Sequence, residues 1–350
     1  MIEVYAPGRA ELLGNHTDYN EGYVLAIAVD RGTTVQGEPR KDSRIRIKSE
    51  TLGASYETDL AGLKPSVSDP WSNYIVGVVA QFKKHHFPIG GFDIVVSSDL
   101  PIGAGLSSSA SLEVATALFL QTAFNLDVPL LEIAKMGQAA EHEYAGVKCG
   151  LLDQIASLYG RENAVTFIDC RNYEVRNITV PHGGAFVIAN SGAKHALITG
   201  EYNERRASCE AAAHALGVPF LRDIDLTALE THKHKLTPQQ LKRARHVVGE
   251  NDRVLQGIDV LRKGDSRAFG ELMFESHESS RVQFENSCAE LDRLVEKAHK
   301  TRGVWGARLS GGGFGGATIN WVDAAYAQEI VSFFGKECLI TSAAKGAEVR

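Results

Sequence analysis

The chain has 350 residues, of which 44% are hydrophobic and 23% charged, which is the composition of an ordinary soluble globular protein. This length exceeds what one compact core usually holds and predicts two domains. The formal net charge of −6 argues against a nucleic-acid or anionic-membrane partner, although a local site can still be basic enough for a nucleotide substrate.

Cysteine usage and the N-terminus bear on the cellular compartment. The five cysteines are scattered and form no Cys-x-x-Cys pair, which argues against a disulfide framework or a zinc site and fits a reducing compartment. The N-terminus lacks a basic-then-apolar signal, and no apolar run is long enough to span a membrane. We therefore expect a cytoplasmic protein.

The first fifty residues combine short strands with one polar segment. The strands are expected at residues 2–6, ending at Pro7-Gly8, and at 24–29, 33–36 and 44–48, the last with period-two alternation. Residues 9–22 are dense in ionisable side chains, and such a run is usually a solvated loop. Its glycines and flanking strands instead favour a constrained turn, on which Asp and Asn side chains suit recognition of neighbouring hydroxyls, as on a sugar.

A helix is expected at 71–84, before the stretch that organises the chain. An apolar strand at 92–97 leads into Pro101-Ile-Gly-Ala-Gly-Leu-Ser-Ser-Ser-Ala110, and an apolar helix follows from residue 112. The two glycines permit a tight turn and the close approach of a ligand. A helix N-terminus attracts anions, and serine hydroxyls bind phosphate oxygens or a hard cation. This stretch predicts a phosphate cradle; the alternative is an ordinary Gly-Ser turn with a serine cap.

Other nucleotide-binding patterns are not met. No Gly-x-x-x-x-Gly-Lys-Ser/Thr occurs, and Ser108 replaces the third glycine of the Rossmann pattern. Residues 311–316 nominally satisfy Gly-x-Gly-x-x-Gly, but a strand rather than a helix is expected after them, at 317–322. We expect these glycines to pack against the ligand loop of the other domain, or to form a plain flexible turn.

The rest of the chain interleaves helices and strands without strict alternation, which favours an α+β fold over a doubly wound α/β fold. Pro-His-Gly-Gly at 181–184 is the best candidate boundary, so we predict domains at residues 1–181 and 182–350. Strands are expected at 165–169, 175–180 and 185–189, and helices at 130–144, 202–216, 238–261, 266–279 and 288–302, with a last one through residue 334.

Two acidic residues are candidates for chemistry. Asp153 lies in the apolar run Cys-Gly-Leu-Leu-Asp-Gln-Ile-Ala, and an acid among apolar neighbours is usually buried with a partner. Glu141 lies late in a predicted helix, where the alternative is a surface acid. The histidines at 85–86 close a predicted helix, and those at 232 and 234 lie in a Lys-rich polar stretch, so both pairs are expected at the surface.

Three segments together resemble the GHMP small-molecule kinases, and galactokinases in particular. They are Gly8-Arg-Ala-Glu-Leu-Leu-Gly-Asn-His-Thr-Asp-Tyr-Asn-Glu-Gly22, Leu100-Pro-Ile-Gly-Ala-Gly-Leu-Ser-Ser-Ser-Ala-Ser111 and Gly306-Ala-Arg-Leu-Ser-Gly-Gly-Gly-Phe-Gly-Gly316. Cys149-Gly-Leu-Leu-Asp-Gln154 and Glu201-Tyr-Asn-Glu-Arg-Arg206 also match. The resemblance implies a ribosomal-S5-domain-2-like N-terminal domain and a ferredoxin-like C-terminal domain with the active site between them. It also implies ATP-dependent phosphorylation of galactose at its anomeric hydroxyl.

The resemblance further implies roles by position. Asp153 looks like the catalytic carboxylate, and Arg9 like its cationic partner. The implied sugar-binding residues are Asn15, His16, Asp18, Gly150 and Tyr202. The implied ATP-binding residues are Gly103, Gly105, Leu106, Ser107, Ser108, Ser109, Trp71 and Tyr74. Ser109 and Glu141 match the Mg²⁺-associated positions. The partners are then a sugar and ATP, and we expect a monomer.

One departure from the family pattern affects the expected substrate. The family usually has a glutamate where this chain has Asn15, contacting the C6 hydroxyl of galactose, and Val-Asn where it has Ala10-Glu11. Asparagine hydrogen-bonds a hydroxyl but would also tolerate a uronic acid, which a carboxylate would repel. Galactose is therefore the leading substrate. The alternatives are a sugar-1-kinase for a C6-altered sugar such as galacturonate, and a sugar- and ATP-binding sensor without catalysis.

Overall fold

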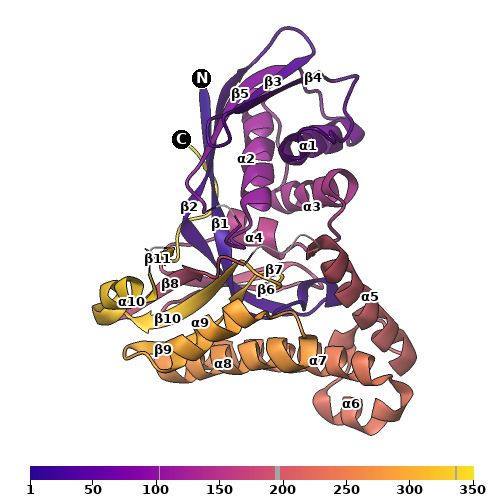
Figure 1. Cartoon of the computed structure of the whole chain (residues 1–350). Coiled ribbons are helices and arrows are strands. Elements are labelled where there is room, and N and C mark those ends of the chain that lie inside the picture. Colours follow the sequence, from indigo (N-terminus) through magenta and orange to yellow (C-terminus); the bar gives the residue numbers. More distant parts are fainter. Residues whose placement is uncertain (102, 194–197, 336) are drawn as a thin grey trace.

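The computed structural model describes residues 1–101, 103–193, 198–335 and 337–350, and its first half is built on a large mixed sheet (Figure 1). The strands run in the order β12-β1-β2-β5-β3-β4, and β6 with β7 extends the sheet from the start of β2. All neighbours are antiparallel except β3 and β5. These strands are β1 (Ile2–Leu13), β2 (Tyr23–Pro39), β3 (Arg44–Ser49), β4 (Ala54–Asp59), β5 (Phe92–Ser98), β6 (Ala164–Asp169), β7 (Glu174–Thr179) and β12 (Glu348–Val349).

Two strands are longer than the sequence predicted. Strand β1 continues to Leu13, so the predicted break at Pro7-Gly8 is wrong. The register with β2 shifts between Pro7 and Arg9, and this irregularity accommodates a proline that lacks an N–H. The strands expected at 24–29 and 33–36 are two parts of β2, which pair with β6 and β5 respectively. As a result, Arg9 and Glu11 stand on a strand rather than in a loop.

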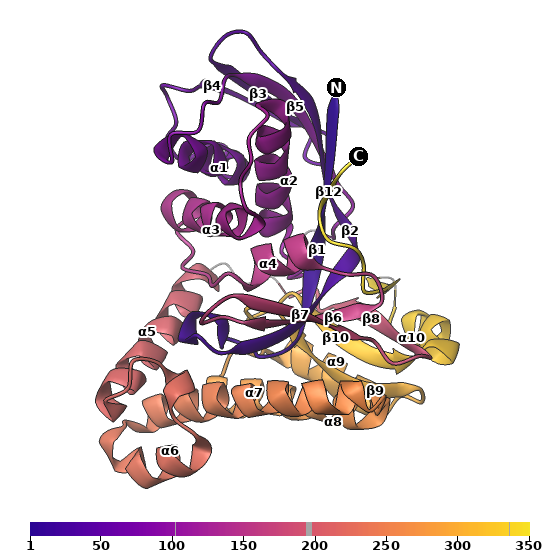
Figure 2. The same ribbon diagram turned by 180° about the vertical axis from the view of Figure 1, so that it is seen from behind.

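Four helices cover one face of this sheet (Figures 1 and 2). They are α1 (Asn73–Lys84), α2 (Ser108–Ala123), α3 (Leu130–Ala140) and α4 (Leu152–Tyr159). Helices α2 and α4 pack on β1 and β2, while α1 and α3 pack against α2. The expected helix at 130–144 ends with one π turn, Glu141–Ala145. Helix α4 was not predicted, because its eight residues are too short for a clear helical period.

The second half of the chain forms a smaller antiparallel sheet with the order β11-β8-β10-β9. One face, with Phe186, Ile188 and Trp321, shares a hydrophobic core with α7 and α8 and with β1 and β2. Helix α10 packs on the opposite face through Val187 and Ile330. The elements are β8 (Gly184–Asn190), α5 (Ile198–Leu216), α6 (Leu226–His232), α7 (Pro238–Arg262), α8 (Ser266–Ser279), α9 (Ala289–His299), β9 (Val304–Ser310), β10 (Ala317–Asp323), α10 (Ala327–Phe334) and β11 (Cys338–Thr341).

The end of the chain returns to the first sheet. The proposed boundary at residue 181 falls between β7 and β8, but Val349 of β12 pairs with Val4 of β1. Both sheets contribute to one core, which joins the two halves of the chain. The combination of a mixed sheet, a separate antiparallel sheet and covering helices confirms the predicted α+β fold. Among the residues that the structure describes, no helix has the length and apolarity needed to cross a bilayer.

Candidate active site

Arg9 on β1 and Asp153 on α4 form an ion pair across 144 positions of sequence. Arg9 Nε donates a hydrogen bond to Asp153 Oδ1 at 2.7 Å, and Arg9 Nη1 donates to the carbonyl oxygen of Gly105, also at 2.7 Å. Ser107 Oγ donates to the second oxygen of Asp153. The side chain of Arg9 is 6% exposed and that of Asp153 21%. A buried guanidinium thus holds a carboxylate that still reaches solvent, beside the glycine-serine stretch.

The glycine-serine stretch forms a hollow of about 240 Å³ at the N-terminus of α2. Gly103 and Gly105 adopt φ values of +75° and +66°, and Ser107 is also left-handed with φ 56°. These residues wrap the chain around the first turn of α2, where backbone N–H groups have no partner within the helix. The described residues of this stretch, from which Ile102 is excluded, therefore have the geometry of an anion cradle.

The glycine turn at 311–316, which follows β9, lies against this cradle. A Cβ atom on Gly105 would lie 3.1 Å from the carbonyl oxygen of Ser310, and one on Gly311 would lie 3.1 Å from that of Gly105. Gly311 has φ +81°, which L side chains rarely adopt. The predicted contact between these glycines and the glycine-serine stretch of the other half is confirmed.

A second hollow, of about 170 Å³, adjoins the cradle and shares Arg9, Gly311 and Gly312 with it. Four of the five sugar-binding candidates line it: Asn15, His16, Asp18 and Tyr202. The fifth, Gly150, lies beside Asp18, because a Cβ atom there would come within 2.0 Å of Asp18 Oδ2. Asp153 lines the same hollow, so the ion pair stands where the two hollows meet.

Asp18 and His16, which line this second hollow, have pKa values far from their ordinary values. Burial, together with the charges of Asp153 and Glu11, raises the pKa of Asp18 from 3.8 to about 7. Burial lowers the pKa of His16 to about 3, so this imidazole is neutral near pH 7. Its Nε2 lies 3.1 Å from the carbonyl oxygen of Gly312. The hollow is therefore acidic, with Arg9 as the one lining cation among the described residues.

A third hollow, of about 290 Å³, lies on the other side of the cradle and shares Ser108 and Ser109 with it. Trp71 and Tyr74 line it, together with apolar residues that include Leu52, Val96, Leu100 and Leu112. An aromatic and aliphatic lining suits a planar heterocyclic base. The three hollows thus run in series, with the cradle in the middle.

Ser109 and Glu141 meet beneath the cradle. Ser109 Oγ donates to Glu141 Oε1 at 3.0 Å, and Gln154 Nε2 and Cys149 Sγ contact the other oxygen. Burial and the charge of Asp153 raise the pKa of Glu141. A cation bound beside Glu141 would therefore stabilise its ionised form. Among the described residues no three His, Cys, Asp or Glu side chains form a metal-holding group. One carboxylate and one hydroxyl fit Mg²⁺, which is usually held by few protein oxygens together with phosphates.

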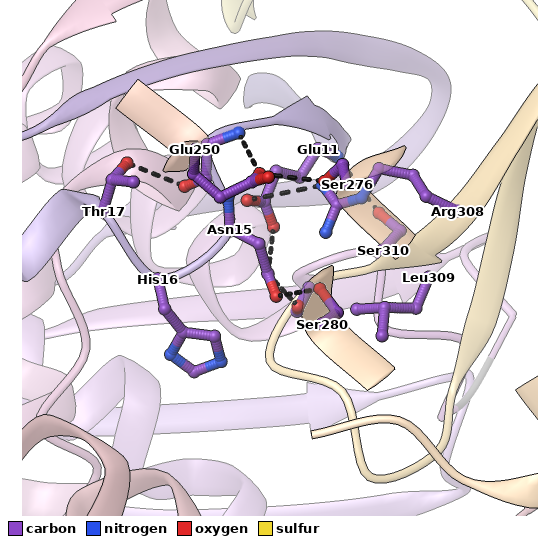
Figure 3. A network of polar contacts seen from close by, with 12 residues as sticks. Glu11, Asn15, His16, Thr17, Glu250, Ser276, Ser280, Arg308, Leu309 and Ser310 are labelled. Atoms are coloured by element: carbon purple, nitrogen blue, oxygen red, sulfur yellow. Dashed lines mark hydrogen bonds and ion pairs between the residues drawn. The ribbon is translucent and has the colours of Figure 1, made fainter. Parts of the chain in front are cut away.

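The sequence did not indicate the residues that support the sugar-side loop, which is the segment 14–18 after β1. Glu250 on α7 is fully buried and accepts hydrogen bonds from the backbone N–H groups of Gly14 and Asn15, at 2.9 and 3.0 Å (Figure 3). His246 Nε2 lies 3.0 Å from the carbonyl oxygen of Asn15. The helical spacing could have indicated that Glu250 is buried. Glu250 lies three residues after Val247 and four before Val254, which places it on the buried face of α7.

Comparison with protein-family models gives three matches along the chain. Residues 2–39 match the galactokinase galactose-binding signature, residues 73–161 the N-terminal domain of GHMP kinases, and residues 258–339 the GHMP kinase C-terminal model. The first match contains Arg9 and Asn15, and the second contains the cradle and Asp153.

Similar proteins extend the likeness over nearly the whole chain. The galactokinase of Pasteurella multocida is 44% identical over 91% of this chain and 84% of its own length. The galactokinase of Homo sapiens is 41% identical over 99% of this chain and 92% of its own. The crystal structure of Lactococcus lactis galactokinase complexed with galactose superposes with a TM-score of 0.95, at 32% identity, covering 99% of this chain and 94% of that one. A mevalonate kinase structure, at 21% identity and a TM-score of 0.67, shares the fold.

Proposed function

This chain belongs to the galactokinases of the GHMP kinase family, and we propose from that premise that it transfers the γ-phosphoryl group of ATP to the anomeric hydroxyl of galactose. The products are galactose 1-phosphate and ADP. The observation that carries the proposal is the serial arrangement of the three hollows. The Arg9–Asp153 pair lies between the cradle and the second hollow, which we call the sugar-side hollow. This order matches a base, a phosphate chain and a hexose laid end to end.

The chemistry follows from the placement of Asp153. Its carboxylate accepts the proton of the anomeric hydroxyl, whose oxygen forms the bond to the γ-phosphorus as the bond to the β-phosphate oxygen breaks. Arg9 keeps this carboxylate in place and offsets the negative charge that develops on the phosphoryl oxygens. Phosphoryl transfer depends mainly on positioning and charge stabilisation, and a buried guanidinium held by Gly105 supplies both.

The remaining candidates take positions on either side of this pair. His16, Asp18 and Tyr202 line the hollow that takes galactose, Gly150 lies beside Asp18, and Asn15 also belongs to the lining. The cradle from Gly103 to Ser109 holds the phosphates, and Trp71 and Tyr74 enclose the base. The intact ion pair favours an enzyme over a non-catalytic sensor. We further propose a cytoplasmic monomer, which light scattering and cell fractionation would check.

Mg²⁺ supplies charge neutralisation on the β- and γ-phosphate oxygens when bound, and we propose Ser109 and Glu141 as its protein ligands. Replacing Glu141 by glutamine is expected to raise the Mg²⁺ concentration for half-maximal activity by about tenfold to a hundredfold. The neighbouring exposed Glu143→Gln is the matched control and is expected to leave this concentration unchanged. Equal Mg²⁺ dependence in both variants would contradict the assignment.

The overall function is tested by ADP release with a panel of sugars. Galactose is expected to support turnover, with glucose and galacturonate far behind. Absence of galactose-dependent ADP release would reject the proposed function. Binding of both galactose and ATP without product would instead identify a sensor.

The affinity for galactose is expected to depend on pH through Asp18, whose pKa is about 7. An ionised carboxylate accepts sugar hydroxyls, and protonation removes one acceptor site and the charge. Affinity should therefore fall as pH drops through 7, with the dissociation constant rising about tenfold between pH 8 and pH 6. Isothermal titration with galactose from pH 5.5 to 8.5 measures this. Asp18→Asn should bind weakly with a flat profile, whereas a flat profile in the unmodified protein would refute the role of Asp18.

A further inference from the structure

The side chain of Asn15 has no hydrogen-bonding capacity left for a sugar. Its Nδ2 donates to Glu11 Oε2 at 3.1 Å and to the carbonyl oxygen of Gly311 at 2.9 Å. Its Oδ1 accepts from Asn286 Nδ2 at 2.9 Å and from Ser280 Oγ at 3.3 Å (Figure 3). An amide offers two donor hydrogens and two acceptor positions, and all four are used. Asn15 is 1% exposed, so the surrounding protein fixes its orientation.

Glu11, by contrast, has unused acceptor capacity in the same place. It lines the sugar-side hollow from β1 and is 2% exposed. Its Oε2 accepts from Asn15, while its Oε1 has no hydrogen-bond partner among the described residues and lies 3.5 Å from Arg308 Nη1. A carboxylate offers about four acceptor positions, so Glu11 keeps acceptor positions beyond the one that Asn15 uses and the one that faces Arg308.

We propose that Glu11 is the specificity-determining carboxylate of the sugar site and accepts the C6 hydroxyl of the hexose, with Asn15 as the positioning residue that orients it. This proposal rests on the proposed function. The family pattern places asparagine at position 11 and glutamate at position 15, and this chain has the two residue types exchanged. Because the two side chains are hydrogen-bonded to each other, the exchange keeps one carboxylate in one polar pair.

The proposal changes the expectation for uronic acids. Asn15 on its own would tolerate a carboxylate at C6, but Glu11 places carboxylate oxygens beside it. Burial raises the pKa of Glu11, while Arg308 and Arg9 lower it, and Arg308 Nη1 lies 3.5 Å from Glu11 Oε1. A carboxylate at C6 would add a charge that has no further cation beside this pair in the part of the chain that the structure describes. Asp18 and Asp153 line the same hollow, and Arg9 is its one cation among the described lining residues. A second carboxylate brought into such a poorly solvated site is repelled. A neutral hydroxymethyl group is therefore selected, and galacturonate is excluded.

The test compares galactose, 6-deoxygalactose and galacturonate as substrates. The unmodified protein should prefer galactose to 6-deoxygalactose by at least about a hundredfold in kcat/KM, since the deoxy sugar leaves a buried acceptor unpaired. Glu11→Gln should reduce this preference about tenfold, mainly through KM for galactose, because a hydrogen bond to a charged group is stronger than one to a neutral amide. KM for ATP should not change. Glu38→Gln, an exposed change on β2, is the matched control.

The outcomes separate the proposals. If Glu11→Gln lowers kcat/KM equally for galactose and 6-deoxygalactose, Glu11 has a structural role alone and the inference is wrong. If the unmodified protein does not discriminate between these sugars, or turns over galacturonate as fast as galactose, the inference fails without any variant. Loss of galactose turnover in the unmodified protein would reject the proposed function itself.

A second variant guards against misfolding of the first. The double exchange Glu11→Asn with Asn15→Glu keeps one carboxylate and one amide in the pair. It should recover the preference for galactose over 6-deoxygalactose to within about tenfold of the unmodified value. The single Glu11→Asn change should not. A folded double variant that shows no recovery would contradict the pairing of these two residues in sugar selection.

Discussion

Replacing Asp153 by asparagine is expected to lower kcat by about a thousandfold or more, while the dissociation constant for galactose changes less than about fivefold. The amide cannot accept the proton of the anomeric hydroxyl, whereas its shape fills the same space. Binding is preserved because His16, Asp18 and Tyr202 also line the hollow and remain in the variant. This difference between turnover and affinity is what separates a proton acceptor from a residue that merely shapes the site.

The measurement is ADP release under saturating substrates, together with calorimetric titration by galactose. Asp127→Asn, a change of the same type at an exposed position, is the matched control and should keep full activity. Thermal melting checks that the variant is folded, since Arg9 loses its ionic partner but keeps its hydrogen bond to Gly105. Equal losses in kcat and in galactose affinity would contradict the assigned role.

Replacing Glu250 by alanine is expected to lower the free energy of unfolding by about 3–5 kcal/mol, the usual cost of breaking a buried charge pair. Glu250 accepts from Gly14, Asn15 and Ser276, and it pairs with Arg253. Burial alone would raise its pKa, but Arg253, His246 and Arg308 hold the pKa of this carboxyl well below its usual range. The variant should also raise KM for galactose, because the Gly14–Asn15 backbone loses its anchor.

Chemical denaturation of the unmodified protein, Glu250→Ala and the exposed Asp252→Ala on the same helix measures this effect. A depressed carboxyl pKa stabilises the fold above the unfolded value near 4.5, and this contribution is lost as pH falls below it. The gap in stability between the unmodified protein and Glu250→Ala should therefore narrow on acidification from pH 5. An effect no larger than that of Asp252→Ala would show that the buried network does not hold the sugar-side loop.

Features that depend on neighbouring residues were predictable from the sequence. The long helices α7 and α8 and the strand β10 follow from hydrophobic periodicity, and the cradle follows from Gly103, Gly105 and the serines at a strand-to-helix turn. The left-handed angles of Gly103 and Gly105 are locally encoded, because glycine adopts such angles without a steric penalty, whereas the left-handed angle of Ser107 has no such local reason. Arg9 and Asp153 were identified through their place in matching motifs, while their contact is a finding of the structure.

The tertiary structure alone decided how distant residues act together. The continuity of β2, the short helix α4, the support of Asn15 by Glu250 and the pairing of Asn15 with Glu11 carry no clear signal in spacing or composition. Glu250 and Asn15 are 235 positions apart, and burial rather than local propensity brings their polar groups together. Local patterns thus determined the long helices, the strand β10 and the motifs. The packing of the two halves decided which side chain can still accept a sugar hydroxyl. A buried polar group forms its hydrogen bonds with the neighbours that the fold provides, and those neighbours are distant in sequence.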